Sequence, residues 1–163
     1  MKKKFLFLCF STFLIQAHLY AQTPDKSIIP QPVKIELKEG VFNINNQTQI
    51  AVDNSQEMFK LGVFLANAIK TFSNLNIVIV PKSQIKNPQN VVQIITDLSL
   101  QENEGYKISI TPNEIKLIAK DGAGIFYAIQ TLTQLFPIGH SDNFTISCLE
   151  IEDYPRFQWR GMH

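Results

Sequence analysis

The adjacent acids Glu152 and Asp153 are the residues in this sequence whose chemistry is easiest to picture. Two carboxyl groups that flank a glycosidic bond, one as general acid and one as base or nucleophile, are the machinery of most glycosidases. The residues before them, 144–151, are predicted to form a strand, and consecutive side chains of a strand point to opposite faces. If that strand continues, the pair cannot flank one bond. We therefore interpret Glu152 as a solvated linker acid beside a turn residue, and predict no catalytic residue in this chain.

Histidine, cysteine and serine chemistry is equally sparse. After residue 21 the sequence contains only His140 and His163, and it has no His-Glu-x-x-His or Cys-x-x-Cys spacing that would hold a metal. His140 lies in a polar stretch, which is typical of a solvated loop. A Ser-His-Asp triad would lack the Gly-x-Ser-x-Gly turn that presents a nucleophile. We expect neither a metal nor a cofactor.

The stretch Asp121-Gly122-Ala123-Gly124 precedes a predicted helix. Free N–H groups at a helix N-terminus can bind an anion. However, the stretch lacks the third glycine and the lysine of the phosphate-binding motifs. A tight turn from strand to helix, for which glycine is well suited, is therefore the favoured interpretation.

Two segments have the periodicity of helices that pack on a core. Apolar residues recur at intervals of three and four from Met58 to Phe72 and again from Ile125 to Phe136, where Pro137 ends the second helix. Asn54, with Glu57 three residues later, is predicted to cap the first helix. The apolar stripe of the second helix, which includes Ile129, is expected to be buried.

The remaining periodic segments are strands. The clearest is a hairpin, with arms 106–110 and 115–119 around the turn Thr111-Pro112-Asn113-Glu114. A half-buried strand is predicted at Val33–Leu37, with Glu39-Gly40 as its turn, and further strands are predicted at 41–44, 48–52, 77–80, 91–95 and 144–151. The sequence thus predicts an α+β fold, in which a mixed or antiparallel sheet is covered by two helices.

The N-terminus has the pattern of a secretory signal. Lys2, Lys3 and Lys4 precede an apolar run at residues 5–15 that is too short for a comfortable membrane span, and cleavage is expected after Ala21. Residues 1–21 are therefore predicted to be a signal peptide, and the protein to be exported to the periplasm or secreted. The rest of the chain has 12 basic and 14 acidic residues, which does not favour nucleic acid. Its single cysteine, Cys148, cannot form an internal disulfide, and its apolar neighbours favour burial.

Three stretches of the sequence form a familiar series. They are Ile29-Pro-Gln-Pro, the segment from Asp121 to Phe136, and Glu152-Asp-Tyr-Pro-Arg-Phe-Gln-Trp-Arg-Gly-Met162. Together they resemble the N-terminal region of the β-N-acetylhexosaminidases of glycoside hydrolase family 20. The resemblance extends from about Ile29 to His163, and the second and third stretches are its specific parts.

The resemblance implies an organisation and a chemistry. In that family an α+β accessory domain precedes a (β/α)8 catalytic barrel, so residues 22–152 would be the accessory domain, and 153–163 a linker and the truncated first barrel strand. The enzymes release terminal β-linked GlcNAc or GalNAc by substrate-assisted, retaining catalysis. The sugar's 2-acetamido oxygen attacks the anomeric carbon, a glutamate acts as general acid, and an aspartate orients the acetamido group. That pair belongs further along the barrel, so this chain alone is expected to be inactive.

One functional position carries over from the resemblance. The arginine before glycine in the first barrel strand binds hydroxyls of the terminal sugar, and it matches Arg160, whose fork of donors can reach two hydroxyls. An arginine paired with an acid at the domain junction is the other interpretation of Arg160, while Trp159 is expected to pack between barrel and accessory domain. No membrane contact is expected after signal cleavage. The alternative function is a stand-alone carbohydrate-binding or structural module that shares the accessory fold.

Overall fold

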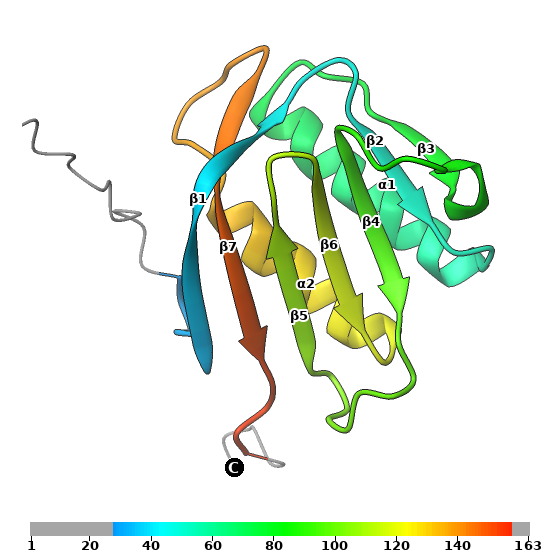
Figure 1. Ribbon diagram of the computed structural model, residues 1–163, viewed down its shortest axis with the longest axis vertical. Coiled ribbons are helices and arrows are strands. Elements are labelled where there is room, and N and C mark those ends of the chain that lie inside the picture. The colour runs from blue at the N-terminus through cyan, green and yellow to red at the C-terminus, as the bar shows by residue number, and fades with distance from the viewer. Residues whose placement is uncertain (1–27, 158–163) are drawn as a thin grey trace, which may run out of the picture.

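A mixed sheet with both α-helices on one face makes up the part of the chain that the computed structural model describes, residues 28–157 (Figure 1). Residues 1–27, which include the predicted signal peptide, and residues 158–163, with Trp159 and Arg160, lie outside the described residues. The sheet contains β1 (Lys34–Ile44), β2 (Gln49–Val52), β3 (Val78–Pro81), β4 (Val91–Thr96), β5 (Tyr106–Ile110), β6 (Glu114–Ala119) and β7 (Phe144–Asp153). The helices are α1 (Gln56–Phe72) and α2 (Gly122–Gln134), and a short 3-10 turn follows β3 at Lys82–Gln84. The predicted α+β class, with two helices covering the sheet, is confirmed.

The strand order places the first and last strands next to each other. It runs β1-β7-β5-β6-β4-β2-β3, with β3, β2, β4 and β6 parallel and β5, β7 and β1 joined by antiparallel pairing. Lys34 at the start of β1 lies opposite Glu152 near the end of β7, and Ile44 lies opposite Phe144. The chain therefore enters and leaves the domain at the same corner of the sheet.

Both predicted helices are present, with small differences at their ends. The first is capped by Ser55, whose hydroxyl oxygen accepts a hydrogen bond from the Met58 N–H at 3.1 Å, and not by Asn54 as the capping pattern predicted. The second begins at Gly122, three residues earlier than predicted, because Asp121 caps it. The predicted buried stripe of this helix is confirmed, since its members are at most 2% exposed: Ile125, Ile129, Leu132 and Phe136.

The predicted hairpin is also present, whereas the first strand differs from its prediction. β5 and β6 pair around the turn, in which the Thr111 N–H donates to the Glu114 carbonyl at 2.9 Å. The segments 33–37 and 41–44, predicted as separate strands, belong to one long strand, β1, which begins at Lys34. Glu39-Gly40 is an irregularity within it rather than a turn: the register with β7 shifts between Leu37 and Val41. Gly40 has a φ of +102°, which glycine adopts readily.

The prediction that Val33–Leu37 is a half-buried strand is wrong in its burial. Ile35 and Leu37 are 40% and 49% exposed. They lie opposite the buried residues Ile151 and Leu149, so they are on the helical side of the sheet. The helices, however, pack on β2, β3, β5 and β6, and β1 lies beyond them at the edge (Figure 1).

The core fills the space between the sheet and the two helices. Its fully buried members include Ile50, Ile94, Ile108 and Leu117 from the strands and Leu65 and Ile129 from the helices. Such close-packed interiors resist deformation, so the strand ends are held in fixed positions. No helix within residues 28–157 is long and apolar enough to span a bilayer.

Candidate functional site

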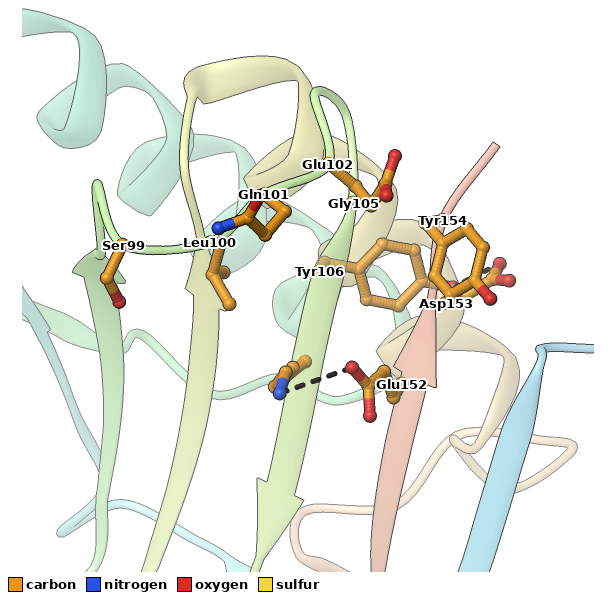
Figure 2. Close-up of a pocket in the computed structure, with 10 residues that line it drawn as sticks. Ser99, Leu100, Gln101, Glu102, Gly105, Tyr106, Glu152, Asp153 and Tyr154 are labelled. Carbon is orange, nitrogen blue, oxygen red and sulfur yellow. Dashed lines mark hydrogen bonds and ion pairs between the residues drawn. The ribbon is translucent and has the colours of Figure 1, made fainter. Parts of the chain in front are cut away.

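A hollow of about 410 Å³ opens where the chain leaves the sheet (Figure 2). Its walls are residues 99–102 in the loop between β4 and β5, residues 105–107 at the start of β5, and residues 152–154 at the end of β7. We call this hollow the exit pocket. Antiparallel pairing of β5 with β7 places Tyr106 opposite Asp153, and Lys107 opposite Glu152. The sheet therefore fixes two of the three walls.

Tyr106 is a buried polar residue at the wall of the exit pocket, only 6% exposed, with its hydroxyl on the helical side of the sheet. Its hydroxyl donates to the Asp153 carboxylate at 3.3 Å and lies 2.6 Å from the hydroxyl of Thr131 on α2. Because Tyr106 donates to Asp153, the Thr131 hydroxyl donates to Tyr106. Burial raises the pKa of Tyr106 to about 12, and the nearby Asp153 charge adds to the effect. The phenol thus remains protonated, as a structural donor.

Asp153 also holds the segment that enters the sheet. Its second carboxylate oxygen accepts from the Val33 N–H at 3.2 Å. Beyond β7, the Arg156 guanidinium donates to the Gln31 carbonyl at 3.1 Å, so the exit segment lies along the entry segment. The Gln134 side chain on α2 exchanges two hydrogen bonds with the backbone of Ile29, at 2.9 and 3.1 Å. Entry, exit and α2 are therefore joined at one corner.

Glu152 and Asp153 face opposite sides of the sheet, as the strand argument predicted. Glu152 lies 3.2 Å from the Lys107 ammonium, whereas Asp153 bonds to Tyr106 on the helical side. Their place in the chain differs from the prediction, because β7 continues to Asp153. They are strand residues rather than a linker acid and a turn residue. Two carboxylates on opposite faces cannot share one glycosidic bond.

The loop wall of the exit pocket is held by short-range hydrogen bonds. The Ser99 hydroxyl and N–H both donate to Asp97, at 2.6 and 2.9 Å, and these bonds lower the pKa of that carboxyl. At the loop's other end a Cβ on Gly105 would lie 3.0 Å from the Glu102 Cβ and 3.3 Å from the Tyr154 Cβ. The absence of a side chain at Gly105 therefore lets the loop approach the exit strand closely.

The glycine-rich stretch forms the junction from β6 to α2, as the favoured interpretation expected: Asp121 caps the helix, and residues 122–124 belong to its first turn. One Asp121 carboxylate oxygen accepts from the Gly124 N–H at 2.8 Å and the other from the Glu104 N–H at 3.3 Å. A Cβ at Gly124 would lie 2.5 Å from the Gly105 carbonyl oxygen. Glycine is required there because the helix start touches the start of β5. The carboxylate occupies the Gly124 N–H, one of the N-terminal donors that an anion would use, and places a negative charge at the helix start.

The other candidate residues do not gather into a site. His140 is exposed in a loop, and Cys148 is buried, as predicted, with the pKa of its thiol raised by that burial. Among residues 28–157, no group of three or more histidine, cysteine or acidic side chains is placed to hold a metal. Arg160, the predicted sugar-binding residue, lies outside the described residues.

A second surface feature covers the outer side of the two helices. Five apolar side chains on α1 and α2 are between 36% and 51% exposed: Phe59, Val63, Phe64, Phe126 and Tyr127. The rings of Phe64 and Phe126 touch across the helices, with centroids 5.4 Å apart. We call this surface the aromatic face. The opposite side of the sheet carries ion pairs instead, such as Glu36 with Lys38 at 2.8 Å.

Comparison with known proteins identifies the domain. Residues 25–154 match the model of glycosyl hydrolase family 20, domain 2. Over 145 residues the chain is 26% identical to a β-N-acetylhexosaminidase of Cellulomonas fimi, covering 85% of this chain and 28% of that protein. It is 29% identical over 141 residues to a β-hexosaminidase of Porphyromonas gingivalis, covering 83% and 18%. The chain thus spans less than a third of these relatives.

The fold agrees with the same assignment. A solved Streptomyces plicatus N-acetyl-β-hexosaminidase, in complex with thio-NAGlucal, superposes with a TM-score of 0.73 at 25% identity. The superposition covers 85% of this chain and 28% of that one. Sequence and structure therefore indicate the same region of the same proteins. The chain belongs to glycosyl hydrolase family 20 and carries domain 2, the accessory domain of that family's β-N-acetylhexosaminidases.

Proposed function

We propose that this chain is the non-catalytic, N-terminal part of an exported exo-β-N-acetylhexosaminidase. The intact enzyme would remove terminal β-linked GlcNAc or GalNAc by substrate-assisted, retaining catalysis on a (β/α)8 barrel that follows the accessory domain. The observation that carries the proposal is the family match over residues 25–154, together with hexosaminidase relatives several times longer than this chain.

The described carboxylates support a non-catalytic role. General acid catalysis needs a carboxyl group within hydrogen-bond reach of the leaving oxygen. Asp153 bonds to Tyr106 and to the Val33 N–H, and Glu152 pairs with Lys107 on the opposite side of the sheet. These acids stabilise the sheet corner. The substrate would meet its acid and its acetamido-orienting aspartate elsewhere, in the barrel.

The aromatic face supports a role in packing against the barrel. Its five apolar side chains lie on the two helices, with the Phe126 ring against those of Phe64 and Tyr127, while the other side of the sheet presents charged pairs that water solvates well. Contiguous exposed apolar surface rimmed by polar residues is typical of an interaction site. The catalytic domain of the same chain is the partner that would bury it, leaving the charged side of the sheet to solvent.

Two further parts of the proposal concern residues outside the described range. Lys2–Lys4 and the apolar run at 5–15 support export with removal of residues 1–21. Arg160 would bind hydroxyls of the terminal sugar from the first barrel strand. Terminal N-acetylhexosamine would then bind as a substrate only when the barrel is intact.

Activity assays with two proteins test the enzymatic proposal. Purified residues 22–163 should not hydrolyse an aryl N-acetyl-β-glucosaminide, whereas the gene product extended through a barrel should. In the longer protein Arg160→Ala should reduce both affinity and rate. Turnover by residues 22–163 that Glu152→Gln abolishes would overthrow the proposal, because it would make the Glu152-Asp153 pair catalytic.

Proteolysis and melting of the same two proteins test the packing role. Phe126→Lys places a charge on the aromatic face, at a side chain that is 39% exposed here. It should leave the melting temperature of residues 22–163 nearly unchanged but lower that of the extended protein and expose its domain junction to protease. Equal effects on both proteins would show that the aromatic face is not an interdomain surface.

A further inference from the structure

The exit pocket has an aromatic wall that no part of the proposed enzyme mechanism uses. Tyr154 is 38% exposed and lines the pocket together with Tyr106. Figure 2 shows the two rings at the same end of the pocket, beside Asp153. The face of an aromatic ring is electron-rich, so it packs favourably on the polarised C–H groups of a sugar ring. The Tyr106 side chain is held by hydrogen bonds to Thr131 and Asp153, so Tyr154 is the ring that can adjust to a ligand.

Polar groups of several kinds surround this aromatic wall. Gln101 and Glu102 project from the loop, where their amide and carboxylate have no hydrogen bond to the described part of the chain. Glu152 and Lys107 also line the pocket, and they form an ion pair at 3.2 Å. The pocket therefore offers donors and acceptors together. Sugar hydroxyls both donate and accept, so they match such a mixed set better than a purely apolar or purely ionic ligand would.

The volume of the exit pocket and the charges around it limit the class of ligand that it can bind. About 410 Å³ lies at the small end of ligand pockets, which suits a single pyranose ring rather than a long chain. Two carboxylates stand at the pocket, those of Glu102 and Glu152, against one ammonium group, that of Lys107, while the Asp153 carboxylate is bonded to Tyr106 and Val33 on the helical side. This excess of negative charge opposes anionic sugars. An uncharged pyranose fits both conditions.

The walls of the pocket are formed in advance of binding. Gly105 allows the loop to lie against Tyr154, and Asp97 holds the start of the loop through Ser99. Pairing of β5 with β7 fixes the strand walls. A ligand would consequently bind without the cost of ordering a flexible loop.

We propose that the exit pocket is a second, non-catalytic binding site for one uncharged pyranose residue of a glycan. The biological role of this site rests on the proposed function, because the site would hold a glycan beside the domain junction of a glycan-degrading enzyme. Its existence as a binding site is independent of catalysis. The opening is broad and its contacts are few, so the affinity of the isolated site is expected to be in the millimolar range.

An NMR titration of residues 22–163 tests this site directly. With N-acetylglucosamine or its β-1,4 trimer added, saturable amide shifts should appear at Gln101, Gly105 and Tyr154 and be absent from the aromatic face. Tyr154→Ala should weaken binding about tenfold, and Tyr154→Phe should retain most of it because the ring remains. Tyr127→Ala is the matched control, since Tyr127 is 39% exposed on the other side of the molecule, and it should bind as the parent does.

The other possible results of the titration each support or overturn the proposed site. Spectra of the variants that overlay with the parent away from the substitution would show that weaker binding is not unfolding. No saturable shift, shifts located elsewhere, or equal losses in Tyr154→Ala and Tyr127→Ala would overturn the site. Equal binding of glucuronic acid would contradict the charge argument. Loss of binding in the barrel-containing protein would show that the catalytic domain occupies the pocket, whereas loss of hydrolysis alone would leave the site standing and count only against the proposed function.

Discussion

Replacing Tyr106 with phenylalanine should lower the free energy of unfolding at neutral pH by about 1–3 kcal/mol. The ring is retained, so the packing of the core is nearly preserved. What is lost is a hydroxyl that lies 2.6 Å from Thr131 and 3.3 Å from Asp153. Thr131 is only 6% exposed, so its hydroxyl loses its partner in a place with little access to water. Asp153 keeps its bond from the Val33 N–H, which limits the loss.

The same tyrosine makes the free energy of unfolding depend on pH, in a direction that follows from its raised pKa. Its pKa rises from 10.0 to about 12 in the folded protein, so folding favours the neutral phenol. The contribution is fully present below pH 10 and is lost as the pH rises towards 12. Two units correspond to about 2–3 kcal/mol at most. The parent should therefore lose stability between pH 10 and 12 more steeply than Tyr106→Phe.

Urea unfolding of residues 22–163, followed by circular dichroism at several pH values, measures both effects. Absorbance at 295 nm would report tyrosine ionisation in the folded protein over the same range. Tyr127→Phe is the control, because its hydroxyl is on an exposed side chain, and it should change stability by less than about 0.5 kcal/mol. If Tyr106→Phe unfolds at the same urea concentration as the parent and shows the same alkaline slope, the hydrogen-bond network carries no stability and our reasoning fails.

Three other predictions concern folding and processing. Ile129→Asp should abolish folding, because an unpaired carboxylate at a fully buried position costs several kcal/mol, comparable to a domain's whole stability; an unchanged melting curve would contradict the packing. Gly124→Ala should destabilise the domain by roughly 1–3 kcal/mol, since the added carbon would lie 2.5 Å from the Gly105 carbonyl oxygen; a melt at the parent's temperature would show that the helix start can move. The exported protein should begin at Gln22, and N-terminal sequencing that finds Met1 in a membrane fraction would instead indicate an uncleaved anchor.

The sequence predicted the parts of the fold whose signals are local. The helical spacing from Met58 to Phe72 and the alternation around the turn at Thr111–Glu114 each depend on neighbours within a few residues, and both elements are present. The long-range arrangement was not predictable in this way. Pairing of β1 with β7 joins residues a hundred or more positions apart, and nothing local in Val33–Leu37 shows that the strand lies beyond the helices. The alternation of apolar residues in this segment therefore predicted burial, whereas the position of β1 at the edge of the sheet leaves Ile35 and Leu37 exposed.

The sequence correctly predicted that Glu152 and Asp153 cannot act together on one bond, but it did not predict the hydrogen-bond network beside them. The strand rule correctly separated Glu152 from Asp153, because alternation of side chains is a local property. The network around Tyr106 was missed, although one signal was available. Thr131 is a polar residue on the buried side of a helix that is otherwise apolar there, and buried hydroxyls are nearly always hydrogen-bonded. Such a residue predicts that a partner exists, but not that Tyr106 is the partner.

The antiparallel pairing of β1 with β7 has a consequence for a chain under tension. Lys34 and Glu152, where the polypeptide enters and leaves the sheet, are directly paired. A force that pulls the two ends apart therefore acts at one end of the ladder and along its hydrogen bonds, which lie perpendicular to the strands. The bonds would break one after another, as in a zipper, instead of sharing the load in shear. The irregularity between Leu37 and Val41 divides this zipper into two sections. We therefore expect this domain to unfold at a low pulling force, even though its well-packed core stabilises it against heat.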